Sequence, residues 1–179
     1  MKILVLGESG QVGSELATQL ENVLSVAGQN YSLVLASRAE VDVADLPALR
    51  DFLKLHSSDW IVNATAYTAV DNAENEVSQA YMVNEHAVHC LAEYCRSQKA
   101  RLVHISTDYV FDGDGVNPFG ETHPVSPLGI YGTSKLAGED TIRNTLSAHI
   151  ILRTAWVFGA TGNNFVKTML RLAESRAEL

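Results

Sequence analysis

Thr107, Tyr131 and Lys135 carry side chains that together could move a proton. On a helix, the spacing of Tyr131 and Lys135 places the phenol and the ammonium one turn apart on the same face. A positive charge beside a tyrosine, whose ordinary pKa is about 10, favours the phenolate and lowers that pKa. Such a tyrosine could exchange a proton with an alcohol or a ketone at neutral pH. The three residues therefore predict acid–base chemistry on a carbinol or carbonyl oxygen.

A glycine signature near the start of the chain indicates a nucleotide cofactor. Gly7, Gly10 and Gly13 follow the apolar run at 2–7 and open a helical pattern, with Gln11 and Val12 between the last two. In this context, the first glycine permits a tight turn, the second lets a pyrophosphate approach, and the third lets the helix and strand pack closely. The helix N-terminus would offer N–H groups and a partial positive charge to the phosphates. Together with the tyrosine and lysine, the signature predicts hydride transfer.

The end of the second expected strand bears on the choice between NADPH and NADH. The sequence there is Ala36-Ser37-Arg38, without the acidic residue that binds the ribose hydroxyl of NAD. Arg38 could pair with a 2′-phosphate, so NADPH is favoured, and NADH stays open. Asp42 and Val43 would flank the adenine. Small residues after the third strand, at Ala64 and Ala66, would leave room for the ribose and pyrophosphate.

Apolar strand-like runs alternate with helical patterns along the chain, which predicts an α/β fold: a Rossmann-type doubly wound parallel sheet with helices on both faces. At 179 residues the chain fits one NAD(P)-binding domain, 1–179. Thr107 ends the fourth strand and so lies at the edge where such sheets bind ligands. The expected strands cover residues 2–7, 31–36, 59–64, 101–106 and 149–155, and the expected helices cover residues near 11–22, 46–56, 75–98, 131–146 and 162–176.

Two local features refine this assignment. Asp45 is expected to cap the second helix, and Pro47 stands early in that helix, where a missing N–H is tolerated. The stretch from Thr107 to Ile130 holds four glycines and three prolines and follows no helical or strand period. A long irregular segment inside a domain is usually functional, so we expect it to border the site.

Composition excludes several classes of function. The formal net charge is −8, and no basic cluster offsets it, which argues against nucleic acid and anionic membranes as partners. No apolar run approaches the ~20 residues that span a bilayer, and no signal-peptide pattern begins the chain. Cys90 and Cys95 are expected to be reduced thiols, so the protein is placed in the cytoplasm.

Three other groups of polar residues are interpreted as structural. Glu85, His86, His89 and Cys90 crowd one expected helix without a further ligand, so no metal site is predicted. The run at 112–115 lacks the span and the glutamate of a calcium loop and is interpreted as a turn. His104, inside the fourth strand, is expected to pack beside the sheet and take no part in catalysis.

The chain resembles the extended short-chain dehydrogenase/reductase superfamily, and within it the dTDP-4-dehydrorhamnose reductase family. The resemblance covers nearly the whole sequence. The stretches that carry it are the GxxGxxG at 7–13, VNATAYTAVD at 62–71, STDYVFDG at 106–113, YGTSK at 131–135 and LRTAWV at 152–157.

The resemblance implies a role for particular residues. Tyr131 would donate the proton, Lys135 would support it, and Thr107 would tune it, while Asn84 would support the proton path. Further residues fall into two sets by the same resemblance: Gly10, Gln11, Val12, Asp42, Val43, Ala66, Tyr67 and Thr68 would contact the cofactor, and Thr107, Asp108 and Trp156 the dTDP-sugar.

The same resemblance leaves alternatives. Related dehydratases carry a glutamate where this chain has Tyr109, so elimination loses its base and reduction of a 4-keto-6-deoxy sugar is favoured. An epimerase and an NADP-binding regulatory subunit without catalysis remain as rivals, and a homodimer is one assembly that the sequence leaves open. Family members also carry a carboxyl-terminal substrate domain that is missing here, so we expect this chain to be a fragment that binds cofactor and turns over poorly.

Overall fold

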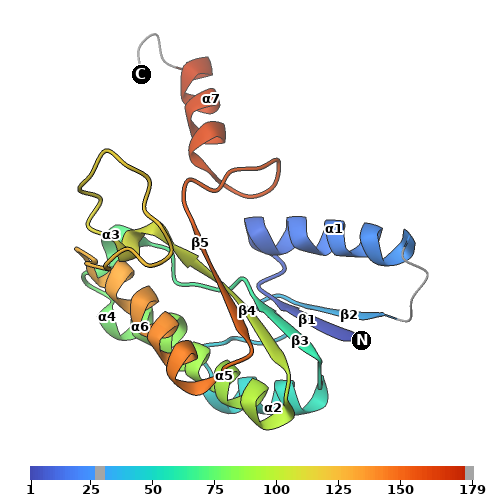
Figure 1. The fold of residues 1–179 in the computed structure, drawn as a ribbon. Coiled ribbons are helices and arrows are strands. Elements are labelled where there is room, and N and C mark those ends of the chain that lie inside the picture. Colours follow the sequence, from blue (N-terminus) through green and yellow to red (C-terminus); the bar gives the residue numbers. More distant parts are fainter. Residues whose placement is uncertain (27–30, 176–179) are drawn as a thin grey trace.

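Five parallel strands form one sheet within residues 1–26 and 31–175, the part of the chain that the computed structural model describes (Figure 1). The strand order is β2-β1-β3-β4-β5, which confirms the predicted doubly wound sheet. The chain runs outward from β1 on both sides, so the crevice between the carboxyl ends of β1 and β3 is the switch point where such sheets bind ligands. The strands are β1 (Lys2–Leu6), β2 (Ser32–Ala36), β3 (Trp60–Asn63), β4 (Arg101–Thr107) and β5 (His149–Thr154).

The longer helices match the predicted ranges closely, and two short helical elements, at 70–73 and 108–110, lie outside every predicted helix. The helices are α1 (Gln11–Val26), α2 (Leu46–Leu55), α3 (Val70–Ala73), α4 (Val77–Tyr81), α5 (Ala87–Gln98), α6 (Ile130–Thr145) and α7 (Phe165–Ser175), with a π-helical turn η1 (Met82–His86) and a 3-10 turn η2 (Asp108–Val110). The expected helix at 75–98 is therefore a continuous run of α4, η1 and α5. Of the last expected helix, residue 176 lies outside the described residues.

The helices lie on both faces of the sheet. Figure 1 shows α2, α5 and α6 side by side on one face and α1 on the other, while α7 extends away from the sheet. Asp45 caps α2 as predicted, since its carboxylate accepts a hydrogen bond from the backbone N–H of Ala48 at 3.0 Å. The segment from η2 to α6 is otherwise irregular, as its composition predicts.

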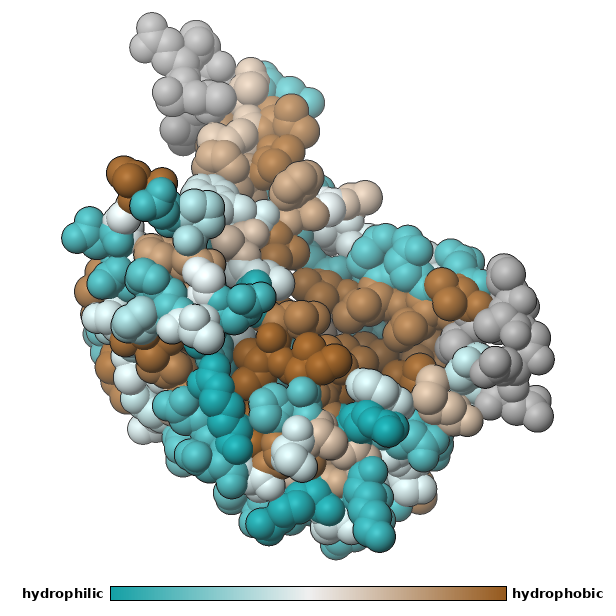
Figure 2. All heavy atoms as spheres, viewed as in Figure 1, coloured by the Kyte–Doolittle hydropathy of each residue, from teal (hydrophilic) through white to brown (hydrophobic). Residues whose placement is uncertain are grey.

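The central strands form the core of the molecule. Leu4, Val5 and Leu6 of β1 are fully buried because this strand is covered on both faces, which is typical of parallel sheets. The edge strand β5 differs: Ile150 is 47% exposed and Leu152 is 46% exposed. Figure 2 shows hydrophobic side chains gathered in the middle of this view, below α1 and around β5. None of the helices in the described part of the chain is long and apolar enough to cross a membrane.

Candidate active site

The glycine turn joins β1 to α1 and depends on glycine at two positions. Gly7 has a φ of +86°, in the region that side chains disfavour, and its amide donates to the carbonyl of Ala36 at 2.8 Å. A Cβ atom on Gly13 would collide with the carbonyl of Gly7, so only glycine lets the first turn of α1 lie against the end of β1. Gly10 lies between them, and its amide donates to Gly7 at 2.9 Å. The turn has the geometry that the signature predicts.

A cavity of about 350 Å³ opens between this turn and the end of β2. Its walls come from the glycine turn, from the segment after β2 and from the segment after β3, which meet at the switch point of the sheet. The sequence-predicted cofactor residues that line it are Gly7, Gly10, Arg38, Asp42, Val43, Ala66, Tyr67 and Thr68. Its position at the glycine turn suits the adenosine half of a dinucleotide.

The charged groups at the rim of this cavity are paired with one another. The guanidinium of Arg38 donates from Nε and Nη2 to Oδ2 of Asp42 at 3.1 and 2.8 Å. A hydrogen bond from the backbone N–H of Ala44 and the contact with Arg38 lower the pKa of Asp42. Glu40, which the sequence prediction did not include, accepts from the backbone N–H and the hydroxyl of Ser37. The Ser37 donors therefore already hold one anionic group.

A second cavity, of about 670 Å³, continues from the glycine turn to the end of β4. Gln11 and Val12 at the start of α1 form one wall, and the segment after β5 forms another. The structure brings Thr107, Tyr131 and Lys135 into the lining of this cavity, as predicted from their spacing. The strand edge, the helix α6 and the glycine turn thus meet at one place.

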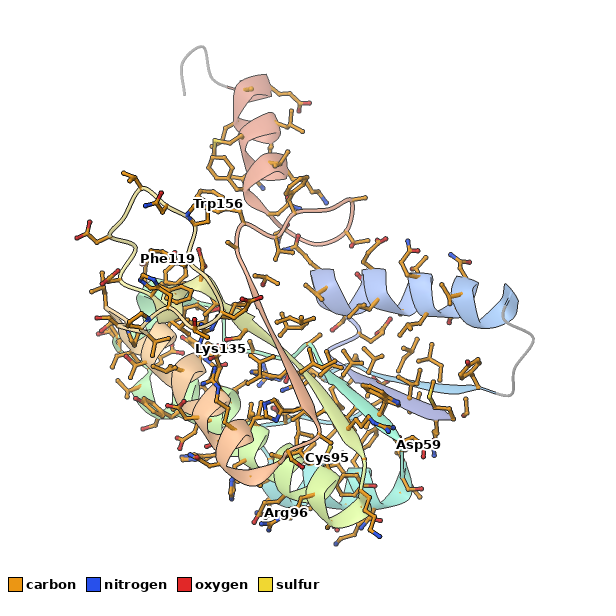
Figure 3. All side chains as sticks on the ribbon, in the orientation of Figure 1. Asp59, Cys95, Arg96, Phe119, Lys135 and Trp156 are labelled. Carbon is orange, nitrogen blue, oxygen red and sulfur yellow. The ribbon has the colours of Figure 1, made fainter. Side chains whose placement is uncertain are left out.

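Lys135 points from α6 toward the sheet (Figure 3) and is 1% exposed. Its Nζ donates to the carbonyl oxygen of Ile105 at 2.7 Å and lies 3.2 Å from Nε2 of His104. Burial lowers the pKa of Lys135 to about 8, although the charge of Glu139 raises it. His104 is fully buried, as expected, but its contact with Lys135 was not predicted.

Tyr131 is buried at 9% exposure, and its pKa differs from the sequence-based expectation. Burial raises the pKa of Tyr131, which outweighs the opposite effect of a hydrogen bond with the Thr107 hydroxyl. The expected lowering of this pKa by Lys135 is therefore wrong for this structure, because burial, with the charges of Asp108 and Tyr109, raises it and Lys135 is not among the groups that shift it. A phenol with a raised pKa carries its proton at neutral pH, which suits a proton donor.

Thr107 is held at the end of β4 by the turn that follows it. Its hydroxyl oxygen accepts from the backbone N–H of Tyr109 at 3.2 Å, and the hydroxyl donates to Asp108 at 3.3 Å. The ring of Tyr109 packs edge-on against Tyr131, with 5.4 Å between the ring centres. The turn after β4 thus holds the Thr107 hydroxyl and packs against the ring of Tyr131.

Asn84 lies in the π-helical turn and connects two parts of the site. Its side-chain oxygen accepts from the backbone N–H of Tyr67 at 2.9 Å, and its amide donates to the hydroxyl of Ser134 at 3.0 Å. A Cβ atom on Gly138 would collide with the carbonyl of Asn84, so α6 approaches the π-helical turn closely. Asn84 therefore fixes the segment after β3 against the helix that carries Tyr131 and Lys135.

A third cavity, of about 550 Å³, lies outside Tyr131 and is lined by Asp108, Tyr109 and Trp156. Trp156 is 75% exposed and stands between β5 and α7 (Figure 3). Its φ of 51° is uncommon for a residue other than glycine, and such strain clusters at functional sites. Its ring packs edge-on against Phe165 of α7 at 5.3 Å.

Of the sequence-predicted site residues, Gly13 and Asn84 line none of the three cavities; Gly13 supports the glycine turn from behind, and Asn84 ties the segment after β3 to α6. The sequence did not predict that Asn63 of β3 contacts Nδ1 of His104, or that His104 in turn contacts Lys135. Both are polar residues inside buried strands. That is the signal that could have found them, because a buried polar side chain needs a partner.

The residues interpreted as structural do not form a metal site in the described ranges, where no group of three or more His, Cys, Asp or Glu side chains could hold an ion. Cys90 and Cys95 are buried free thiols. Burial raises the pKa of Cys95 to about 12, so this thiol stays protonated.

The sheet order, the glycine turn and the cavity at the switch point together define a Rossmann-type α/β protein. A family model described as RmlD substrate binding domain matches residues 1–179, and the chain belongs to this family.

Relatives support the assignment over the whole chain. A dTDP-4-dehydrorhamnose reductase from Burkholderia thailandensis is 45% identical over 179 residues, which are 100% of this chain and 58% of that protein. The crystal structure of a dTDP-4-dehydrorhamnose reductase from Clostridium acetobutylicum has a TM-score of 0.92 and 37% identity, covering 100% of this chain and 61% of that one. A dTDP-4-dehydrorhamnose reductase from Bacillus anthracis, solved in complex with NADP, has a TM-score of 0.89 and 34% identity, covering 98% and 60%. The chain thus spans roughly three-fifths of the length of these relatives.

Proposed function

We propose that residues 1–179 are the NAD(P)-binding domain of a reductase that converts dTDP-4-dehydro-L-rhamnose to dTDP-L-rhamnose. The observation that carries this proposal is the meeting of Thr107, Tyr131 and Lys135 in one cavity with the glycine turn. The family and the names of the relatives support the substrate class. The remainder of the sugar-nucleotide pocket would come from residues outside this domain, because the relatives are longer.

The cofactor is NADPH in preference to NADH. The glycine turn suits a pyrophosphate, because Gly10 presents backbone without a side chain directly before α1. Arg38 supplies a guanidinium beside the expected position of a ribose 2′-phosphate, and its partner in this structure is the carboxylate of Asp42. Ser37 adds its two donors once the phosphate displaces Glu40, which accepts from them here. The Bacillus anthracis relative was solved with NADP, which agrees with this preference.

The chemistry needs a hydride and a proton. A nicotinamide cofactor held beside Lys135 and the glycine turn would supply the hydride to the ketone carbon and would itself be oxidised. Tyr131 gives its phenolic proton to the ketone oxygen, so the C=O double bond becomes a C–O single bond with a new C–H and a new O–H bond. The hydroxyl of Thr107, which donates to Asp108 in this structure, turns to donate to the same oxygen and orients it. Lys135, when charged, stabilises the phenolate that remains and holds the ribose hydroxyls of the cofactor.

The outer cavity is the place for the sugar. Asp108 and Trp156 line it next to Tyr131, so a ketone reaching the phenol from this side would pass both side chains. The aromatic ring of Trp156 offers an exposed apolar surface for a deoxysugar, and Asp108 offers an acceptor for a sugar hydroxyl.

A Tyr131→Phe variant tests the proposal. The gene's full-length product should consume NADPH stoichiometrically with dTDP-4-dehydro-L-rhamnose, as followed by absorbance. The variant should bind NADPH normally and lose about 10²- to 10⁴-fold in kcat, because it lacks the proton donor.

Tyr94→Phe is the matched control, since it removes a phenolic hydroxyl from α5, away from the three cavities. Full activity in Tyr131→Phe would remove the acid assignment. No net NADPH consumption by the unmodified protein would instead favour an epimerase or a regulatory subunit, because neither consumes the cofactor.

A further inference from the structure

A buried chain of hydrogen bonds leads from the segment after β3 to Lys135. It begins at Asn63, the last residue of β3, passes through His104 of β4 and ends at the lysine amine on α6. Asn63 and His104 are both 0% exposed. Because both side chains are closed off from bulk solvent, their hydrogen bonds must be satisfied inside the protein.

The orientation of the Asn63 amide is fixed by Thr65. Oδ1 of Asn63 accepts from the backbone N–H of Thr65 at 3.1 Å and also contacts the Thr65 hydroxyl at 2.6 Å. A backbone N–H can only donate, so the atom facing it must be the amide oxygen. The amide nitrogen Nδ2 therefore faces Nδ1 of His104, 3.1 Å away.

The tautomer of His104 follows from this orientation. Nδ2 of Asn63 can only donate, so Nδ1 of His104 must accept and carries no hydrogen. Burial, and then the charge of Lys135, lower the pKa of His104 well below its ordinary value, so the ring is neutral. A neutral ring without a hydrogen on Nδ1 carries it on Nε2. His104 thus directs an N–H group toward Lys135.

An N–H group is a poor partner for an ammonium group. A charged lysine has three hydrogens and no acceptor, so it would place one donor against another across the 3.2 Å between Nζ and Nε2. A neutral amine has a lone pair that can accept from Nε2–H while the amine still donates to Ile105 at 2.7 Å. The chain of hydrogen bonds is complete only when Lys135 is neutral.

We propose that Asn63 and His104 are positioning residues that act through Lys135, favouring its neutral amine and coupling its charge to the segment at Thr65. When Lys135 takes up a proton, the ring of His104 must present an acceptor, and the Asn63 amide must then turn away from Thr65. Thr65 lines both the cavity of about 350 Å³ beside the glycine turn, the adenosine-side cavity, and the cavity of about 670 Å³ at the end of β4, the central cavity. The catalytic meaning of this coupling rests on the proposed function, in which Lys135 binds the ribose hydroxyls of the cofactor and stabilises the phenolate of Tyr131.

The other groups around Lys135 do not account for the same effect. Glu139, one turn further along α6, raises the pKa of the lysine and so favours the charged form. Tyr131, one turn before it, keeps its proton because its pKa is raised. The carbonyl of Ile105 accepts from either form of the amine. His104 is thus the group facing the amine on the β4 side that discriminates between the two forms.

Nuclear magnetic resonance of ¹⁵N-histidine and ¹³C-lysine in the unmodified protein tests the inference directly. We expect Nδ1 of His104 to resonate as an unprotonated nitrogen and Nε2 as an N–H above the pKa of Lys135. Titration of Lys135 should then change the His104 resonances at the same pH. A hydrogen on Nδ1 throughout the titration would overturn the inference, and this measurement needs no variant.

Asn63→Asp provides the second measurement, because a carboxylate can only accept. It would accept from Thr65 and from Nδ1–H of His104, so Nε2 becomes an acceptor for the ammonium. We expect the tautomer to reverse and the pKa of Lys135 to rise by about one unit or more, which is about tenfold less neutral amine at a given pH.

A double-mutant cycle with His104→Phe separates this effect from the added negative charge. The rise in the pKa of Lys135 caused by Asn63→Asp should shrink when His104 is absent, and an undiminished rise would contradict the coupling. His89→Gln on α5, where the side chain is half exposed, is the histidine control and should leave both signals unchanged. None of these readouts uses a substrate, so their failure is distinct from failure of the reductase proposal.

Discussion

Arg38 shows how a single residue could serve two states of the protein. Its guanidinium is 76% exposed and is paired with Asp42. An exposed pair of this kind contributes little to stability, so it can be exchanged for a stronger anionic partner. A 2′-phosphate would be such a partner, because an arginine can bind it with two parallel hydrogen bonds.

The cofactor preference can therefore be tested at this residue. Arg38→Ala should weaken NADPH binding about ten- to a hundredfold and leave NADH binding nearly unchanged, because only NADPH carries the 2′-phosphate. Dissociation constants for both cofactors, from the quenching of protein fluorescence, measure this. Arg96→Ala on α5 is the control for the loss of one exposed positive charge. Equal losses for the two cofactors would show that Arg38 acts on the shared part of the dinucleotide.

The helix α6 is tied to the edge of the sheet through Glu139. This carboxylate is fully buried, and it accepts from Arg153 of β5 at 2.7 Å, from Arg143 at 2.6 Å and from the hydroxyl of Ser106 at 2.5 Å. Burial alone would raise the pKa of Glu139, but these hydrogen bonds outweigh it and lower the pKa. The helix that carries Tyr131 and Lys135 is thereby anchored to β4 and β5.

Replacing Glu139 should destabilise the protein. Glu139→Gln removes the charge that the two arginines share, and we expect a loss of about 3 kcal/mol in the free energy of unfolding at pH 7, because a broken buried pair leaves uncompensated charge. Urea unfolding measures it, and Glu93→Gln on the exposed side of α5 is the control. A loss as small as that of the control would mean that the cluster contributes little.

The lowered pKa of Glu139 also predicts that its contribution to the free energy of unfolding depends on pH. Because the folded pKa of Glu139 lies below the unfolded value of 4.5, its contribution is fully present above that value and disappears as the pH falls through the folded pKa. The difference between the unmodified protein and Glu139→Gln should therefore shrink in acid.

Sequence patterns predicted the strands and the longer helices because their apolar periodicity is local. They did not predict the π-helical turn, since its register depends on Asn84 reaching Tyr67 and on the close approach of Gly138, which are distant in sequence. At the site, the positions of Thr107, Tyr131 and Lys135 followed from the strand order. The raised pKa of Tyr131 could not be predicted in this way, because it depends on burial. The contact of Lys135 with His104 could not be predicted either, because the sequence places His104 only in a strand.

At the scale of the whole molecule, the three cavities form a path along the carboxyl edge of the sheet. The adenosine-side cavity and the central cavity are built from segments of this chain that meet at the switch point. The outer cavity lies toward Trp156 and α7, where Phe165 and Leu170 are 56% and 62% exposed. Under the proposed function, this chain therefore supplies more of the cofactor contacts than of the sugar contacts.

This difference predicts how residues 1–179 behave by themselves. They should bind NADPH with an affinity near that of the whole reductase from Burkholderia thailandensis and reduce dTDP-4-dehydro-L-rhamnose at least ~10²-fold more slowly, because remote substrate contacts are needed to position the ketone. Calorimetric binding and NADPH consumption under the same conditions measure the two quantities. Equal turnover by the two proteins would contradict the proposed division of the site.

The π-helical turn makes this helical run tolerant of losing one residue. A wide turn contains one residue more than an α-helical turn but completes about the same rotation, since each residue of an α-helix rotates the chain by about 100° and each residue of the wide turn rotates it less. Removing one residue from 82–86 would therefore let the turn close as an ordinary α-helical turn and keep Ala80, Val88 and Leu91 on the buried face. Such a deletion should spare the fold and displace Asn84, so that the tie between the segment after β3 and α6 is lost.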